Sequence, residues 1–284
     1  MKTKILVPID FSDNSLNAIR YALALYADSA CTFYLMHIYQ IDPFSMQTSA
    51  YILPEKGEEP HDLAKRKAEG QFQEFLKDLQ PYIKNPNHQL ETIITYDLLV
   101  NSVKELVAKQ DIDMVVMGTK GKTGAATAIF GTNAINIMQG IIECPVLAVP
   151  ENIEIKPPKE IVFPTDYEGP FKRRELGYMI DIAQMHEGHI CVLHVKESKE
   201  LTENKLDCKA LLESILEDVD HSFHELEGVG VQDGINTFVN SRGSDMIAFT
   251  NQKQTFFSSI FSNPLVKKLG YHSKVPILVL KNRK

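Results

Sequence analysis

The sequence predicts two tandem α/β domains, each built on a doubly wound, Rossmann-like parallel sheet of five strands in the order 3-2-1-4-5. Three observations support this fold class. Short apolar runs alternate with segments of helical periodicity, and the same alternation restarts near residue 160. A chain of 284 residues is also long enough for about two domains. We therefore expect domains at 1–150 and 160–284, joined by a charged, proline-containing linker at 151–159.

The first half contains patterns for five strands and four helices. Strands are expected near 4–7, 32–38, 90–95, 114–117 and 146–149, and helices near 16–26, 62–83, 99–107 and 134–142. Ser12 or Asp13 can cap the first helix, and Ser102 with Glu105 can form a capping box in the third. Residues 41–60 hold three prolines and are predicted to form a long loop, a kind of segment that often carries function.

Three motifs of the first half recur in the second half in the same order. Ile161–Asp166 repeats Ile5–Asp10, Val192–Val195 repeats Leu35–Ile38, and Val275–Val279 repeats Cys144–Ala148. This order indicates a duplicated domain. A proline, Pro145 or Pro276, opens the last strand of each copy, which favours an edge position. Two such edge strands can satisfy each other's backbone hydrogen-bonding groups by pairing.

The best candidate site is a glycine-rich stretch after the fourth strand. Gly118–Gly124 follows that strand, and Gly131-Thr132 stands where the next helix begins. Glycines let backbone N–H groups approach an anion, and a helix N-terminus offers unpaired donors. In the predicted strand order, Asp10 faces Gly118 at the switch point, where its carboxylate can bind ribose or hold a turn. The alternative for the glycine stretch is a flexible surface loop, and its spacing matches neither a Walker P-loop nor a dinucleotide motif.

At these residues the chain resembles the universal stress protein family. The family's nucleotide signature, G-x2-G-x9-G-[ST], is matched by Gly118, Gly121, Gly131 and Thr132. The resemblance implies that ATP binds, with Mg²⁺, and that Lys120 replaces a frequent histidine while keeping affinity for phosphate. The binding residues that it implies are Pro8, Ile9, Asp10, Ile38, Met117, Gly118, Thr119, Lys120, Gly121, Lys122, Gly131, Thr132 and Asn133. The family also pairs through its fifth strands, which implies an internal pseudo-dimer and allows a homodimer.

The second copy departs from this signature. With the offset of 131 that aligns Pro276 with Pro145, the signature positions hold Phe249, Gln252, Ser262 and Asn263. Asp166 is retained, but the phosphate-binding glycines are not. Three further phenylalanines in this segment either fill a core or form an apolar contact surface: Phe256, Phe257 and Phe261. We therefore expect one nucleotide per chain, in the first half.

Composition narrows the remaining classes of function. Thirty basic and 37 acidic residues give a net charge of −7, which argues against a surface for nucleic acids or anionic membranes. No apolar run approaches the roughly 20 residues of a spanning helix, and the first ten residues do not resemble a signal peptide. Four widely spaced cysteines predict free thiols in a reducing cytoplasm.

No catalytic or metal-binding residue is predicted. His221 and His224 are expected on opposite faces of one strand, His37 and His194 are expected to be core histidines, and no Ser–His–Asp group can be argued from the sequence. The leading hypothesis is an ATP-binding stress-response regulator in which the nucleotide switches or stabilises a conformation. The alternatives are a slow ATPase or nucleotide-dependent transferase, and an interaction scaffold without nucleotide turnover.

Overall fold

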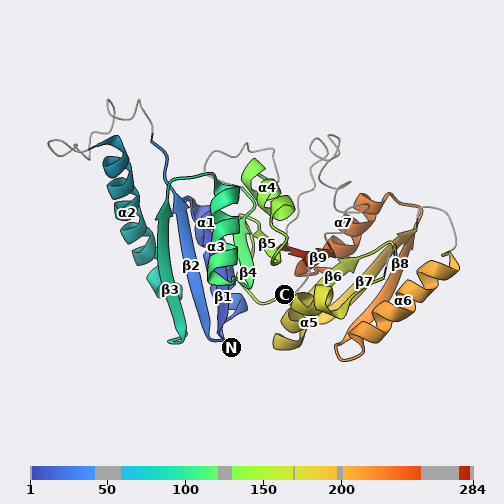
Figure 1. Cartoon of the computed structure of the whole chain (residues 1–284). Helices are drawn as coiled ribbons and strands as arrows, with labels where there is room; N and C mark the ends of the chain where they lie inside the picture. The colour runs from blue at the N-terminus through green and yellow to red at the C-terminus, as the bar shows by residue number, and fades with distance from the viewer. Residues whose placement is uncertain are drawn as a thin grey trace.

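The computed structural model describes residues 2–41, 59–120, 130–168, 170–196, 201–250 and 275–281. These residues form one ten-stranded sheet in the order β3-β2-β1-β4-β5-β10-β9-β6-β7-β8. Figure 1 shows the sheet running through the whole molecule, with the first half at one end and the second at the other. Counted within either half, this is the order 3-2-1-4-5. The predicted topology is confirmed for both halves.

The first half alternates strands and helices as predicted. Its strands are β1 (Thr3–Pro8), β2 (Cys31–Ile38), β3 (His88–Thr95), β4 (Met114–Gly118) and β5 (Val146–Val149). Its helices are α1 (Asp13–Leu25), α2 (Pro60–Leu79), the 3-10 turn η2 (Gln80–Tyr82), α3 (Leu99–Gln110) and α4 (Thr132–Gly140). The predicted loop at 41–60 lies mostly outside the described residues.

The helix starts test the two predicted caps. Ser12 is the N-cap of α1, because its hydroxyl accepts a hydrogen bond from the N–H of Ser15. The predicted capping box of Ser102 and Glu105 is wrong. Helix α3 begins at Leu99 with Leu98 at the N-cap, so Ser102 already lies inside the helix, one turn beyond the position that the motif requires.

The second half repeats the pattern. Its strands are β6 (Glu160–Pro164), β7 (His189–Lys196), β8 (His221–Glu227), β9 (Met246–Thr250) and β10 (Ile277–Leu280), and its described helices are α5 (Arg173–Met185), α6 (Glu203–Leu216) and α7 (Val231–Arg242). Phe249 lies in β9, but the predicted equivalence with Gly118 is wrong. Met246 pairs with Ile161 as Met114 pairs with Ile5, so Phe249 takes the place of Met117, and Thr250 takes the place of Gly118. The predictions for Gln252, Ser262, Asn263 and the three further phenylalanines lie outside the described residues.

The two halves are joined through their last strands. β5 and β10 pair antiparallel, with Leu147 opposite Leu278 and Val146 opposite Val279. The other strand pairs of the described sheet are parallel. The two proline-opened strands therefore satisfy each other's backbone hydrogen-bonding groups within one chain, as predicted. The outer edges of the sheet are β3 and β8.

Both faces of the sheet are covered by hydrophobic layers that cross from one half to the other. Helices α1, α2, α5 and α6 pack on one face, and α3, α4 and α7 on the opposite face. Leu147 and Leu278 are fully buried in the first layer, while Val146 and Val279 are fully buried in the second. Within the described part of the chain, no helix has the length and apolar character that crossing a bilayer requires.

Candidate functional site

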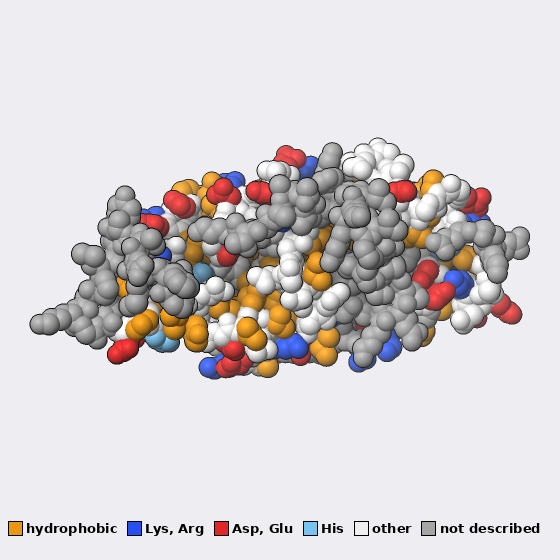
Figure 2. Space-filling view, turned by 90° about the horizontal axis from the view of Figure 1, so that it is seen from above, with side chains coloured by type: hydrophobic (Ala, Val, Ile, Leu, Met, Phe, Trp, Pro, Cys, Tyr) orange, Lys and Arg blue, Asp and Glu red, His pale blue; other side chains and the backbone are white. Residues whose placement is uncertain are grey.

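A cavity of about 700 Å³ opens at the carboxyl ends of the first-half strands. It lies at the switch point between β1 and β4, where ligands bind in doubly wound sheets. The structure gathers eleven of the thirteen predicted residues around it: Pro8, Ile9, Asp10, Ile38, Met117, Gly118, Thr119, Lys120, Gly131, Thr132 and Asn133. Gly121 and Lys122 lie outside the described residues. In the view onto this edge, Figure 2 shows hydrophobic side chains gathered at the surface of the first half.

The N-terminus of α4 forms one wall of the cavity. Its N-cap is Gly131, which offers no side-chain cap to the amides of the first turn. The backbone N–H of Gly131 donates to the carbonyl of Thr119 (2.7 Å), which holds the helix start against the end of β4. Uncapped amides and the positive end of the helix dipole attract an anion. Gly131 has φ −68° and ψ 156°, a conformation open to any residue, so the backbone does not require a glycine here.

Gly118 is constrained by a close approach of α1. A Cβ atom at Gly118 would lie 2.8 Å from Cγ of Asn14, and a contact that short forces a neighbour to move. The Asn14 side chain is buried and donates through Nδ2 to the carbonyl of Lys120 (2.6 Å). Asn14 therefore fixes the backbone of the loop that follows β4. Sequence analysis missed this residue, because only the packing of α1 on β4 brings it there.

Asp10 holds the turn between β1 and α1. Its Oδ1 accepts hydrogen bonds from the N–H (3.1 Å) and hydroxyl (2.5 Å) of Ser12, and Phe11 between them has a φ of 60°. The second half repeats this turn. Asp166 Oδ1 accepts from the N–H of Glu168 (2.9 Å), and Tyr167 has a φ of 55°. The shared turn explains why the aspartate is retained in a half without the glycine signature.

The two equivalent histidines make the same hydrogen bond in both halves. Nδ1 of His37 donates to the carbonyl of Ile9, and Nδ1 of His194 donates to the carbonyl of Thr165, each over 2.8 Å. An aromatic residue of each turn lies against the histidine. The ring centroids of Phe11 and His37 are 4.3 Å apart, and those of Tyr167 and His194 are 5.0 Å apart. His194 is buried, as predicted for a core histidine, whereas His37 is only half-buried. His37 also lines the cavity, which sequence analysis did not predict.

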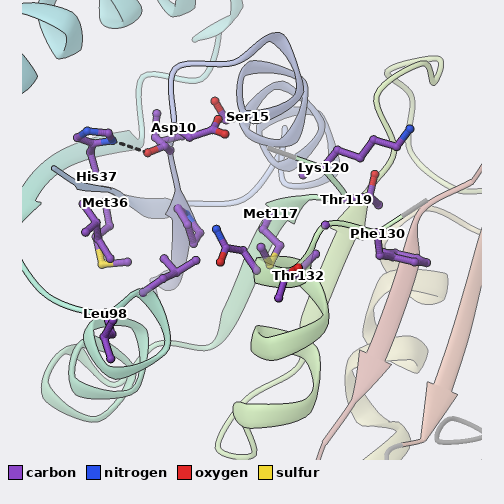
Figure 3. Close-up of a pocket in the computed structure, with 18 of the residues that line it drawn as sticks. Asp10, Ser15, Met36, His37, Leu98, Met117, Thr119, Lys120, Phe130 and Thr132 are labelled. Carbon is purple, nitrogen blue, oxygen red and sulfur yellow. Dashed lines mark hydrogen bonds between the residues drawn. The ribbon is translucent and has the colours of Figure 1, made fainter. Parts of the chain in front are cut away.

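The side of the cavity formed by Met36 and Leu98, beside His37, is here called its apolar end. In Figure 3, Thr119, Thr132 and Lys120 lie on the other side together with the ring of Phe130, and Met117 lies between the two sides. Sequence analysis missed nine lining residues: Ser15, Met36, His37, Gln40, Asp97, Leu98, Leu99, Phe130 and Ala134. Several of them follow the ends of β2 and β3, and the predicted strand order, which places β2 beside β1 and β3 beside β2, was the available signal. The arrangement suits a flat apolar group joined to an anion.

A hydrogen-bonded chain in the second half corrects one expectation. Asp220 Oδ2 contacts His189 Nδ1 (2.8 Å), and His189 Nε2 contacts the hydroxyl of Ser222 (2.6 Å), so the fold does place a serine, a histidine and an aspartate together. His224 Nε2 contacts the same hydroxyl (2.7 Å). The Asp220 side chain is 80% exposed, whereas the aspartate of a catalytic triad is buried. We therefore assign no catalysis to it. The described residues also contain no cluster of three or more His, Cys, Asp or Glu suited to a metal ion.

Comparisons with known proteins agree with this architecture. Residues 1–150 match the family model described as Universal stress protein family. Universal stress protein MJ0531 of Methanocaldococcus jannaschii is 30% identical over 157 residues, covering 55% of this chain and 84% of that protein. Universal stress protein MJ0577 of the same organism is 23% identical over 145 residues, covering 49% and 90%. A universal stress protein crystal structure from Archaeoglobus fulgidus has the same fold over 99% of this chain and 97% of its own, with a TM-score of 0.68 and 17% identity. The chain belongs to the universal stress protein family.

Proposed function

We propose that the cavity of the first half binds ATP, accompanied by Mg²⁺, with its phosphates at the N-terminus of α4 and its base at the apolar end. The observation that carries this proposal is the uncapped first turn of α4, which opens into a cavity that also holds Asp10. A volume of about 700 Å³ lies within the range of small-molecule sites. Lys120 and Thr132 supply further donors to phosphate oxygens, and the Asp10 carboxylate accepts from ribose hydroxyls.

The nucleotide acts as a switch or stabiliser in a cytoplasmic stress-response regulator. Rapid hydrolysis needs a positioned base for the attacking water. Of the two carboxylates among the described lining residues, Asp10 holds its turn and is assigned to ribose, and Asp97 accepts a hydrogen bond from the N–H of Leu98. The alternative is a slow ATPase, and it is tested by measuring the release of phosphate at saturating Mg-ATP. If the protein is instead a scaffold that binds no nucleotide, no nucleotide should co-purify with it. Mass spectrometry of the purified protein measures this.

We expect one ATP to bind per chain. In the sheet, Thr250 of the second half occupies the position of Gly118, because Met246 pairs with Ile161 as Met114 pairs with Ile5. Thr250 carries a branched side chain where Gly118 leaves the backbone open to a phosphate. Calorimetric titration with Mg-ATP should therefore give a stoichiometry near one. A stoichiometry near two would contradict the assignment of the second half.

Asp10→Ala is expected to weaken ATP binding about tenfold and to lower the free energy of unfolding by about 1 kcal/mol, because the carboxylate holds both ribose and the turn. Asp166→Ala is the matched control, since it breaks the equivalent turn in the second half. It should cost about the same stability and leave ATP affinity unchanged. Calorimetry and denaturant unfolding on both variants measure these effects. Equal ATP affinity in the two variants would show that Asp10 only holds its turn.

A further inference from the structure

A lysine of the second half lies on the last turn of the helix that forms the proposed phosphate site. Nζ of Lys281, directly after β10, donates to the carbonyl of Met138 in α4 (3.1 Å). Lys281 is only 6% exposed, and Met138 is fully buried. Burial lowers the pKa of the ammonium to about 8, although Cys144 and Glu143 oppose that shift, so the side chain is mostly charged at neutral pH.

The contact satisfies a carbonyl that the helix itself leaves without a donor. The last carbonyls of an α-helix have no partner within the helix. Here the N–H of Ile141 closes on Ile137, and the next N–H, that of Ile142, turns away to the side chain of Glu143. The carbonyl of Met138 is thus the first one past the regular ladder, and it is buried. An ammonium group there also complements the negative end of the helix dipole.

The geometry separates this lysine from the proposed phosphate site but links it to the same helix. Helix α4 has nine residues, so its two ends are roughly 13 Å apart. Figure 1 shows β10, in red, beside β5 at the lower end of α4, whereas the N-terminus of α4 faces the upper edge. A helix this short is not stable alone and depends on what holds its ends.

The lysine is specific to the second half. Alternation along β10 puts Ile277 and Val279 on the α4 face, and Lys281 continues that series. With the offset of 131, the first half has Pro150 at this position, which has no cation to supply. The pairing of β10 with β5 fixes where Lys281 stands.

We propose that Lys281 is a positioning residue through which the second half holds α4 in place for nucleotide phosphates. This rests on the proposed function of the first half. Through Lys281 the second half, which lacks the glycine signature, contributes to the site by fixing the end of α4 that is remote from the phosphates. The N-terminal amides of α4 then meet the phosphates without first having to be ordered.

The test compares Lys281→Met with Lys196→Met, which removes another strand-end lysine of the second half that pairs with Glu225 and Glu227. Affinities for Mg-ATP and for adenosine are measured by calorimetry on the full chain. Lys281→Met should weaken ATP binding about three- to fivefold and leave adenosine binding unchanged, because only phosphates contact α4. Lys196→Met should change neither affinity.

A second measurement keeps the test independent of nucleotide binding. Hydrogen exchange of the α4 amides in the ligand-free protein should accelerate about tenfold in Lys281→Met and not in Lys196→Met. If the wild-type protein binds no ATP, the proposed function fails, and this exchange alone decides the role of Lys281. Equal losses of ATP and adenosine affinity, or unchanged exchange in α4, would overturn the proposal. Lys281→Gln, which keeps a donor without the charge, replaces Lys281→Met if that variant does not fold.

Discussion

Replacing Gly131 with valine is expected to abolish ATP binding and to leave the fold intact. The backbone of Gly131 has an ordinary extended conformation, so valine adopts it without strain. Its branched side chain would stand at the first turn of α4, where phosphate oxygens need to reach the amides of Thr132 and Asn133. Two hydrogen bonds to a charged group, each contributing about 1.5–3 kcal/mol, correspond to a loss of about 100-fold or more in affinity.

The second half offers a matched control for this variant. Gly230 is the N-cap of α7 and has nearly the same backbone conformation, with φ −64° and ψ 148°. Gly230→Val should therefore bind ATP like the wild type. Calorimetry with Mg-ATP and with adenosine, together with circular dichroism, compares the two variants. Undiminished ATP affinity in a folded Gly131→Val protein would show that the phosphates do not lie at α4.

Leu278→Ala is expected to lower the free energy of unfolding by about 2–5 kcal/mol, as large-to-small changes in a core do. Leu278 is fully buried in β10, opposite Leu147 of β5, in a hydrophobic layer that contains residues of both halves. The loss should therefore reach both halves. Denaturant unfolding should still show a single transition, and hydrogen exchange should accelerate equally in β1 and β7.

An exposed leucine of the same half serves as the control for Leu278. The side chain of Leu206 in α6 is 51% exposed, and Leu206→Ala should change stability by no more than about 0.5 kcal/mol. If Leu278→Ala accelerates exchange in β7 but not in β1, the two halves unfold separately and the shared layers do not couple them.

Local sequence patterns were sufficient to predict the strand order, because each strand and helix is recognised from residues that are neighbours in the sequence. The restart of the pattern at Ile161 and the proline-opened strands at Pro145 and Pro276 predicted two copies and the pairing of their last strands. The antiparallel direction of that pairing was not predicted. The capping box at Ser102 failed for the opposite reason: a four-residue motif cannot show that α3 starts a turn earlier.

The part of the site that sequence reasoning missed depends on tertiary contacts. Asn14 reaches the loop after β4 only because α1 packs against that strand. Leu98 and Met36 line the cavity because β2 lies beside β1 and β3 lies beside β2. The chain of Asp220, His189 and Ser222 joins His189 of β7 to Ser222 of β8 and to Asp220 directly before β8, and no single segment determines the register of these two strands. The glycine signature, by contrast, is a run of spacings within one stretch of chain.

Because β5 and β10 pair within one chain, the assembly of the two halves does not depend on the concentration of the protein. Two separate subunits associate only above a threshold set by their dissociation constant, and dilution drives them apart. Here the partner strand belongs to the same polypeptide, so its local concentration is fixed by the linker and not by the number of molecules in the cell. The assembly therefore persists at any expression level. One copy is free to change its surface and its ligand site as long as it keeps the strand that completes the other.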